Sequence, residues 1–410
     1  MEPIIVHGLA WTTKELFVYP NEFIYWSIQI VMYPYMTGLV AGAFVLSSLY
    51  HVFDQKDLKE LARFSLVFSL ALLPTALMPL LFHLQQPLRG PNVMLTPHFT
   101  SAIAAFGIVF STYGAIVLSE IWFVYREYFV AQTVALRGQQ GVGLAAKRLL
   151  YHALTLGAYD TSAPALAKDK KAVRILAGAG IPVACFLHGY AGFIFGSVKA
   201  NALWMSPLMP VIFIMSAVVS GIALCMLTYI AIMEWRKFRS PLAQVIDGVA
   251  LEDIIGKASR YLLGFLVAAI SLELLDLIFR GYTAMKSWDI LRSVLYHKDF
   301  VNIFVLQYGV GNLLPFILLL LPRLIIRRTV FALIFILYGV FMMRWNVVIG
   351  GQAFSLSFAG FMQYHLPVLP HNLDTYKEGL LGALTVAVTP FILFWLINKI
   401  VPSLKFEGGK

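Results

Sequence analysis

Nine apolar runs recur along this 410-residue sequence, and most are long enough to cross a lipid bilayer. A membrane-spanning helix needs about 20 consecutive apolar residues, because lipid offers no partner for backbone polar groups and the segment must satisfy them internally. These properties predict an all-α, polytopic transmembrane bundle of about nine helices, with residues 1–410 forming one domain. The runs lie near residues 23–52, 61–84, 99–125, 172–197, 208–234, 259–284, 303–322, 328–348 and 378–401.

Composition supports this class: 60% of the residues are hydrophobic and 13% are charged, a balance that excludes an ordinary soluble domain. The net charge of +10 does not indicate a nucleic-acid partner, because the basic residues lie in short connections between apolar runs. Cys185 and Cys225 are the only cysteines, so this chain cannot hold a thiolate-ligated iron–sulfur cluster or a Cys-rich zinc site. Both are expected to pack as small hydrophobes. Residues 1–17 lack the pattern of a cleaved signal peptide.

The connections differ in basic content, which predicts an orientation. Of the 31 Lys and Arg residues, 22 fall in or beside the connections after helices 1, 3, 5 and 7 and the C-terminal segment, and 9 fall on the other side. The positive-inside rule therefore predicts an outer N-terminus and a cytoplasmic C-terminus. The longest cytoplasmic connection, 126–174, contains basic residues and leucines at helical spacing. It predicts either an amphipathic helix at the inner membrane surface or a solvated cytoplasmic helix.

Polar residues within the apolar runs gather in the predicted outer half of the bundle. His188 lies in the apolar stretch from Gly180 to Trp204, and a histidine at membrane depth needs a partner, a cavity or a function. The remaining polar residues of the outer half are His83 at the end of the second run, Arg89 and His98 just beyond it, Glu273, Asp276 and Arg280 on the sixth run, and Arg344 and Asn346 on the eighth.

Two interpretations of this cluster stay open. In a structural one, His188 is neutral and bonds a neighbouring helix, Asp276 pairs with Arg280, and Arg344 meets Glu273 or a backbone carbonyl. In a functional one, the cluster is a quinone pocket. Quinone reduction takes up two protons with two electrons, so His83 or His188 would bond a quinone oxygen, and Asp276 or Glu273 would assist proton transfer. Tyr25 and Trp26 would supply flat walls, unless they belong to the aromatic belt.

A transporter is a weaker alternative. Prolines interrupt several of the runs, as in transporters with broken helices, but the polar residues lie on one side of the membrane and not around its midplane. A channel is weaker still, because no charged ring or filter-like repeat is present.

Several segments resemble the NrfD/PsrC family of membrane subunits. They include YWSIQIVMYPYMTGLVAGAF, HLQQPLR, LHGYAGFIFGSVKANALW and MRWNVVIGGQ. The resemblance covers almost the whole chain and is strongest to the HybB and DsrP branch. His83 matches the family position held by Asp or His, and Arg89 matches the Arg of the motif that follows. His188 matches the histidine of the fourth helix and Arg344 the arginine of the eighth. Gln85 and Gln86 depart from the family pattern, which leaves the shape of that loop open.

The resemblance implies an integral subunit of a prokaryotic cell membrane that holds no haem or iron–sulfur cluster. Such a subunit exchanges electrons between the menaquinone pool and a ferredoxin-like multi-[4Fe–4S] protein docked on the outer face, in anaerobic respiration linked to sulfur or sulfite. Cytochrome-containing subunits are further expected partners. The quinone-binding set is then expected to comprise Tyr25, Trp26, His83, Arg89, His98, His188 and Arg344. A passive membrane anchor of an electron-transfer complex remains the alternative. The expected docking surface is formed by the loops 85–98, 198–207 and 350–376.

Overall fold

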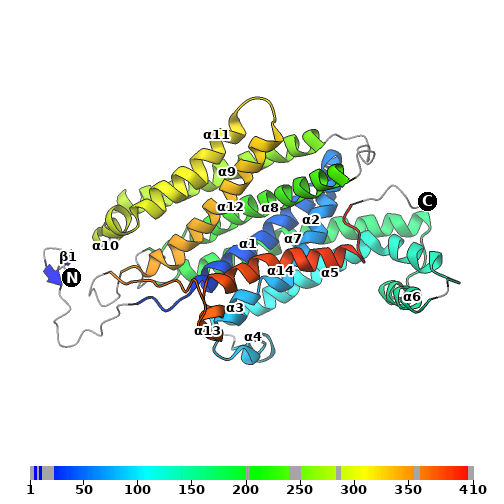
Figure 1. Cartoon of the computed structure of the whole chain (residues 1–410), viewed down its shortest axis with the longest axis horizontal. Helices are drawn as coiled ribbons and strands as arrows, with labels where there is room; N and C mark the ends of the chain where they lie inside the picture. The colour runs from blue at the N-terminus through cyan, green and yellow to red at the C-terminus, as the bar shows by residue number, and fades with distance from the viewer. Residues whose placement is uncertain are drawn as a thin grey trace.

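Long helices lie side by side in this protein and run roughly along its longest axis (Figure 1). Within the described part of the chain, nine helical spans are long and apolar enough to cross a membrane, which confirms the predicted polytopic bundle. The computed structural model describes residues 4–6, 9–11, 23–98, 100–139, 141–199, 201, 203–239, 251–282, 288–354 and 361–404.

The nine spans are built mainly from eleven helices. They are α1 (Ile28–His51), α2 (Lys59–Thr75) with α3 (Met78–His83), α5 (Ala102–Ala135), α7 (Ala163–Gly196), α8 (Met209–Arg239), α9 (Leu251–Tyr282), η5 (Val301–Leu313) with α11 (Leu314–Leu320), α12 (Ile326–Val348) and α14 (Leu380–Asn398). Shorter helices are η1 (Lys56–Leu58), η2 (Pro87–Arg89), α4 (Asn92–Leu95), α6 (Val142–Leu154), α10 (Trp288–Ser293), η4 (Val294–Lys298), η6 (Gly350–Gln352) and α13 (Leu373–Lys377).

The connections form two ends of the bundle. One end carries α4, α10 and α13 and is called the α13 end; the other carries α6 and is called the α6 end. Every connection predicted to lie outside the cell belongs to the α13 end. Which end faces the cell exterior stays a prediction.

Two helices begin earlier than the hydropathy pattern predicts. The predicted run 172–197 is part of α7, which begins at Ala163, and the run 259–284 is part of α9, which begins at Leu251. Hydropathy marks the portion of a helix that lipid can surround, whereas helical hydrogen bonding continues through polar residues such as Lys170 and Lys171. The connection 126–174 contains α6, and the location of that helix at the membrane surface stays a prediction.

Within the described residues, a short β-hairpin is the one element that the all-helical pattern does not predict. Strands β1 (Ile4–Val6) and β2 (Leu9–Trp11) pair antiparallel, with Ile5 opposite Ala10. The β-branched run Ile-Ile-Val favours an extended backbone. The hairpin precedes the first transmembrane helix and leaves the helical class unchanged.

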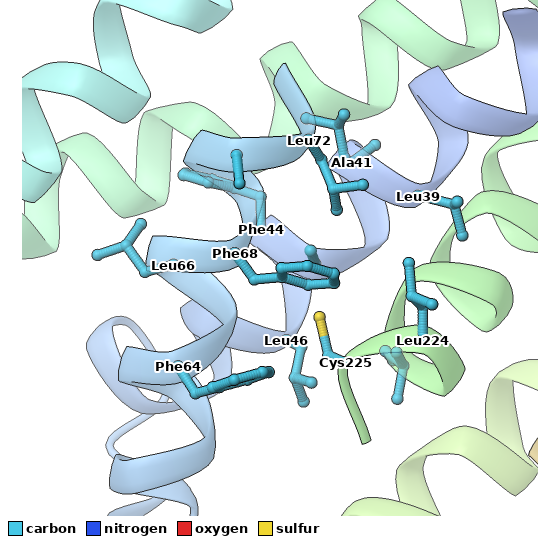
Figure 2. Close-up of a cluster of buried hydrophobic side chains, with 14 of the residues drawn as sticks. Leu39, Ala41, Phe44, Leu46, Phe64, Leu66, Phe68, Leu72, Leu224 and Cys225 are labelled. Carbon is cyan, nitrogen blue, oxygen red and sulfur yellow. The ribbon is translucent and has the colours of Figure 1, made fainter. Parts of the chain in front are cut away.

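The core lies where α1, α2 and α8 pack together. Figure 2 shows Leu46 of α1, Phe64 and Phe68 of α2, and Leu224 and Cys225 of α8 gathered around one apolar centre. Cys225 is fully buried there and Cys185 is half-buried, and neither forms a disulfide. Cys225 therefore packs as a small hydrophobe, as its position in an apolar run predicts.

Paired glycines bring two sets of helices into backbone contact. A Cβ added to Gly221 of α8 would lie 2.5 Å from the Cα of Gly42 on α1, and a Cβ added to Gly339 of α12 would lie 2.5 Å from the Cα of Gly311 on η5. Small residues allow such close approach between membrane helices, where packing replaces the hydrophobic driving force. These contacts set the spacing of the helices that carry the polar residues described next.

Candidate functional site

Three separate polar groups occupy the half of the bundle nearer the α13 end. The first, called the His83 group, comprises Ser27, His83 and Glu378. Ser27 caps the start of α1, His83 ends α3, and Glu378 follows α13 directly. His83 Nδ1 lies 2.9 Å from a Glu378 carboxylate oxygen and 3.4 Å from Ser27 Oγ. The side chains of His83 and Glu378 are 25% and 30% exposed, so this pair is open to a ligand or to water.

The second group, called the His188 cluster, is fully enclosed. Arg344 Nη2 donates to His188 Nε2 at 2.9 Å and to Ser216 Oγ at 2.7 Å, and Thr37 Oγ1 lies 3.4 Å from His188 Nδ1. The Arg344 guanidinium carbon lies 3.8 Å from the centroid of the Phe213 ring. His188 and Arg344 are both 0% exposed. The cluster therefore holds a buried cation through hydrogen bonds and an aromatic face.

The third group, called the Glu273 cluster, depends on an uncommon helix. The segment η5 is π-helical, with hydrogen bonds from residue i to i+5. This geometry brings residues five apart onto nearly one face, and Asn302, Gln307 and Asn312 have that spacing. Gln307 Nε2 donates to Glu273 Oε2 at 2.9 Å, and Asn312 Nδ2 reaches the same oxygen at 3.4 Å. Asn346 Nδ2 donates to Gln307 Oε1 at 2.8 Å, which completes the cluster.

An ion pair lies beside the Glu273 cluster. Arg280 Nε donates to Asp276 Oδ2 at 2.8 Å, and Ser206 Oγ donates to Asp276 Oδ1. Asp276 and Arg280 are 9% and 4% exposed, so the carboxylate and the guanidinium compensate each other within the bundle. This pairing is the one expected on the structural interpretation. Glu273, Asp276 and Arg280 line one small cavity together with Gln307 and Asn346.

The structure contains one of the two predicted partners of Arg344, a backbone carbonyl, and not the other, Glu273. Arg344 reaches the Phe213 carbonyl at 3.3 Å, in agreement with the expectation of a carbonyl partner, and its side-chain partners include His188 and Ser216 in place of Glu273. The spacing along α12 explains the difference. Arg344 and Asn346 are two residues apart, so they lie on different faces, and it is Asn346 that faces the Glu273 cluster.

The remaining predicted residues lie apart from these groups. Trp26 stacks on Trp204 with ring centroids 5.4 Å apart, which makes it part of an apolar cluster. Tyr25 is 81% exposed, and Arg89 and His98 are exposed in the connection after α3. His98 bonds Thr100 at 2.8 Å. The structure thus divides the predicted single pocket into the three groups above and an exposed set at the α13 end.

Sequence reasoning missed most of the hydrogen-bonding partners. Thr37 and Ser216 are unremarkable in an apolar run, and Glu378 is the first residue of the predicted run 378–401, outside the predicted polar cluster. One signal was available, because the amides of Asn302, Gln307 and Asn312 recur every five residues. A helical pattern with 3.6 residues per turn scatters them over different faces. Within the described residues, no group of three or more His, Cys, Asp or Glu side chains could hold a metal ion.

Comparison with known proteins identifies the family. The family described as "Polysulphide reductase, NrfD" matches residues 19–356. The chain belongs to the NrfD family. It is a multi-pass integral membrane protein.

Three relatives show the range of this NrfD-family similarity. A selenate reductase subunit of Mesobacillus selenatarsenatis is 34% identical over 209 residues, or 50% of this chain and 47% of that protein. The match thus spans about half the length of that relative. A putative dimethyl sulfoxide reductase membrane subunit of Halobacterium salinarum is 26% identical over 300 residues, covering 73% and 62% of the two chains. An Hdr-like menaquinol oxidoreductase integral membrane subunit of Archaeoglobus fulgidus is 24% identical over 382 residues, covering 90% and 79%.

Proposed function

We propose that this protein is the membrane subunit of a respiratory redox complex that exchanges electrons between the menaquinone pool and an iron–sulfur protein docked at the α13 end. Its relatives include a subunit of a selenate reductase and the integral membrane subunit of a menaquinol oxidoreductase. The resemblance to the HybB and DsrP branch further supports a DsrP-like role in a complex linked to sulfur or sulfite metabolism. Quinone is the substrate in this proposal.

The observation that carries the proposal is the contact between His83 and Glu378. All three described hydrogen-bond contacts of the ring use Nδ1, two of them with the carboxylate oxygens of Glu378, and the pair is partly exposed at the end of the bundle. A carboxylate on one ring nitrogen orients the imidazole and stabilises it when the other nitrogen takes up a proton. His83 Nε2 is therefore the atom suited to exchange a proton with a quinone oxygen.

The chemistry at His83 follows from this arrangement. Oxidation of a quinol releases two electrons and two protons. A quinol hydroxyl bonded to His83 Nε2 gives one proton to the ring, and Glu378 stabilises the resulting imidazolium. The second proton leaves through the exposed end, and the two electrons would pass one at a time to the iron–sulfur clusters of the partner. In the reverse direction, the protonated His83 returns its proton to the reduced quinone oxygen.

Exposed apolar side chains support docking of a partner at the α13 end. Leu88 and Leu95 are 94% and 76% exposed in the connection after α3, and Leu369 is 73% exposed before α13. Exposed apolar side chains at this end are available for contact with a partner protein. The predicted docking loops 85–98, 198–207 and 350–376 all belong to this end, with residues 200, 202 and 355–360 outside the described part.

The proposal is tested with His83→Gln in the purified complex. An amide keeps one hydrogen bond but cannot exchange a proton, so assembly should persist while quinol-dependent reduction of the partner's clusters falls by about a hundredfold. The matched control is His297→Gln, an exposed histidine in η4 at the same end. Full quinol turnover in His83→Gln would overturn the proton-exchange role and leave the passive-anchor alternative in place.

A further inference from the structure

Two cavities adjoin between α9 and η5, and none of the residues of the His83 group lines either of them. The inner cavity is about 100 Å³ and is lined by Glu273, Gln307 and Asn346, by the ion pair of Asp276 and Arg280, and by apolar side chains. The outer one, about 520 Å³, lies between the same helices and is lined almost entirely by apolar residues. Tyr308 lines both cavities. Asn312 lines the outer cavity and bonds Glu273, which lines the inner one, so the two cavities adjoin at these residues.

Asn346, which lines the inner cavity, carries a buried hydrogen-bond acceptor that has no partner among the described residues. Asn346 Nδ2 donates to the carbonyl oxygen of Asn302 at 3.2 Å and to Gln307 Oε1 at 2.8 Å. Both partners are acceptors, so the orientation of the Asn346 amide is determined by its bonds. Its Oδ1 is buried and has no hydrogen-bond partner in the described part of the chain, and the residue is 5% exposed. Leaving a buried acceptor unpaired is unfavourable. A hydrogen bond donated to this oxygen by a ligand or a water molecule would therefore be favourable.

The hydrogen-bond acceptors of the residues that line the inner cavity determine which head groups can bind there. Asn346 and Glu273 line the inner cavity and both carry acceptor oxygens, while Arg280, which also lines it, donates to Asp276. A hydroxyl group can donate to such oxygens, whereas the phosphate of a phospholipid head group would meet an acceptor and a carboxylate. The cavity therefore favours a neutral head group that carries hydroxyl donors.

The outer cavity is suited to bind an apolar tail, and it opens toward the lipid. Leu274 and Leu313 line it and are 42% and 55% exposed on the membrane-facing surface. Gly309 contributes no side chain to the opening. Ligand pockets of this kind combine an apolar lining with a few convergent polar groups. A lipid-soluble molecule can thus slide between α9 and η5 with its head toward the Glu273 cluster.

We propose that these two cavities form a second quinol-binding site, separate from the His83 group. The dihydroxy head donates to Asn346 Oδ1 and to the Glu273 carboxylate, and the isoprenoid tail lies in the outer cavity. The inference takes its ligand class from the proposed function, but its residues are all distinct from Ser27, His83 and Glu378. The two sites can therefore be tested independently.

The test uses a photoreactive naphthoquinol that carries an aryl azide and a short isoprenoid tail. The probe is added in reduced form to the full complex in lipid nanodiscs, and labelled peptides are mapped by mass spectrometry. Leu274→Trp fills the outer cavity from the lipid side, and Asn346→Leu removes the acceptor. We expect each variant to lower labelling of residues 251–282 and 301–320 by about tenfold. Because Leu274 is exposed to lipid, its variant keeps the test decisive if Asn346→Leu assembles poorly.

The matched control is Leu275→Trp. Leu275 is 53% exposed on the same helix and does not line either cavity, so labelling should stay at the wild-type level. Labelling of α9 and η5 that persists in Leu274→Trp would overturn the second site, as would displacement of the probe by phosphatidylglycerol but not by unlabelled quinol. Label confined to the peptides of His83 and Glu378 would refute the second site and leave the proposed function intact. Label confined to α9 and η5 would support the second site and refute the His83 site.

Discussion

Arg344 Nη2 lies 2.9 Å from His188 Nε2, and both side chains are completely buried. A guanidinium can only donate hydrogen bonds, so His188 Nε2 must accept and the ring must be neutral with its proton on Nδ1. That proton faces Thr37 Oγ1 at 3.4 Å. The histidine of the fourth membrane span thus acts as the acceptor that keeps a buried arginine in place.

This relationship predicts different outcomes for two substitutions of His188. Gln can still accept a hydrogen bond from Arg344, so His188→Gln should preserve both assembly and quinol turnover. Leu cannot, and His188→Leu should lower stability by about 1–3 kcal/mol because it leaves a buried donor unpaired. Thermal unfolding in detergent and quinol-dependent electron transfer measure the two effects. Loss of turnover in a fully assembled His188→Gln would instead assign His188 a role in proton exchange.

The contact between Gly42 and Gly221 predicts a steric effect. Gly221→Val should lower the yield of folded protein and destabilise it by about 1–3 kcal/mol, because the added side chain forces α1 and α8 apart. Gly178→Ala on α7 is the control, since an added Cβ there meets nothing within 4 Å. Size-exclusion profiles and unfolding midpoints compare the two. Equal stability of both variants would show that the helices separate at no cost.

Hydropathy was sufficient to predict the nine spans, because the bilayer imposes a length and an apolar composition on each one separately. It could not predict the helix ends. The segment before the apolar part of α7 is polar, yet it stays helical and brings Asp169 to Arg126. Hydropathy reports the environment of a segment, whereas helix ends depend on capping and on tertiary contacts.

The site was less predictable for a different reason. The pairing of Asp276 with Arg280 is local on one helix, and the sequence spacing was enough to predict it. The pairing of Arg344 with His188 joins positions far apart in the chain, so it depends on how helices pack. The Glu273 cluster further depends on a π-helical segment, whose register a pattern with 3.6 residues per turn does not contain.

The ion pair between Arg126 and Asp169 is expected to stabilise the 126–174 connection. Arg126 donates to Asp169 Oδ2 through Nε at 2.8 Å and Nη2 at 2.6 Å, and its Nη1 donates to the Asp160 carbonyl at 2.6 Å. Both side chains are nearly buried. Arg126→Ala should therefore destabilise the protein by about 3–5 kcal/mol, since it leaves an uncompensated buried carboxylate. Lys170→Ala, at an exposed neighbouring position, serves as the control in the same unfolding assay.

The charge bias predicts that the α13 end faces the cell exterior. In a background with Cys185 and Cys225 replaced by Ala, single cysteines are placed at Gln86 and Gly138, both of them exposed in connections at opposite ends. A membrane-impermeant maleimide added to intact cells should label Gln86→Cys, and Gly138→Cys should react only after permeabilisation. The reverse pattern would invert the topology and place the predicted docking surface in the cytoplasm.

Asp299 lies between η4 and η5, and its burial leads us to expect that the free energy of unfolding depends on pH. Burial raises the pKa of this carboxyl above its ordinary value, and the hydrogen bond from Asn302 Nδ2 at 3.1 Å offsets only part of the rise. The folded state thus binds the proton more tightly than the unfolded chain does. The stability gained from protonation is full below the ordinary aspartate pKa and is lost as the pH rises through the raised pKa of the folded state.

Asp299→Asn should remove this loss, because the amide resembles the protonated carboxyl. The unfolding midpoint of the wild type should fall from acid to neutral pH by more than that of the variant, and the two curves should differ most above the raised pKa of Asp299. Asn302→Leu provides the opposite change: without its hydrogen bond the pKa of Asp299 rises further, so the loss of stability should move to higher pH. Identical pH profiles for wild type and Asp299→Asn would mean that solvent reaches the carboxyl and that its burial in this structure does not disfavour the charge.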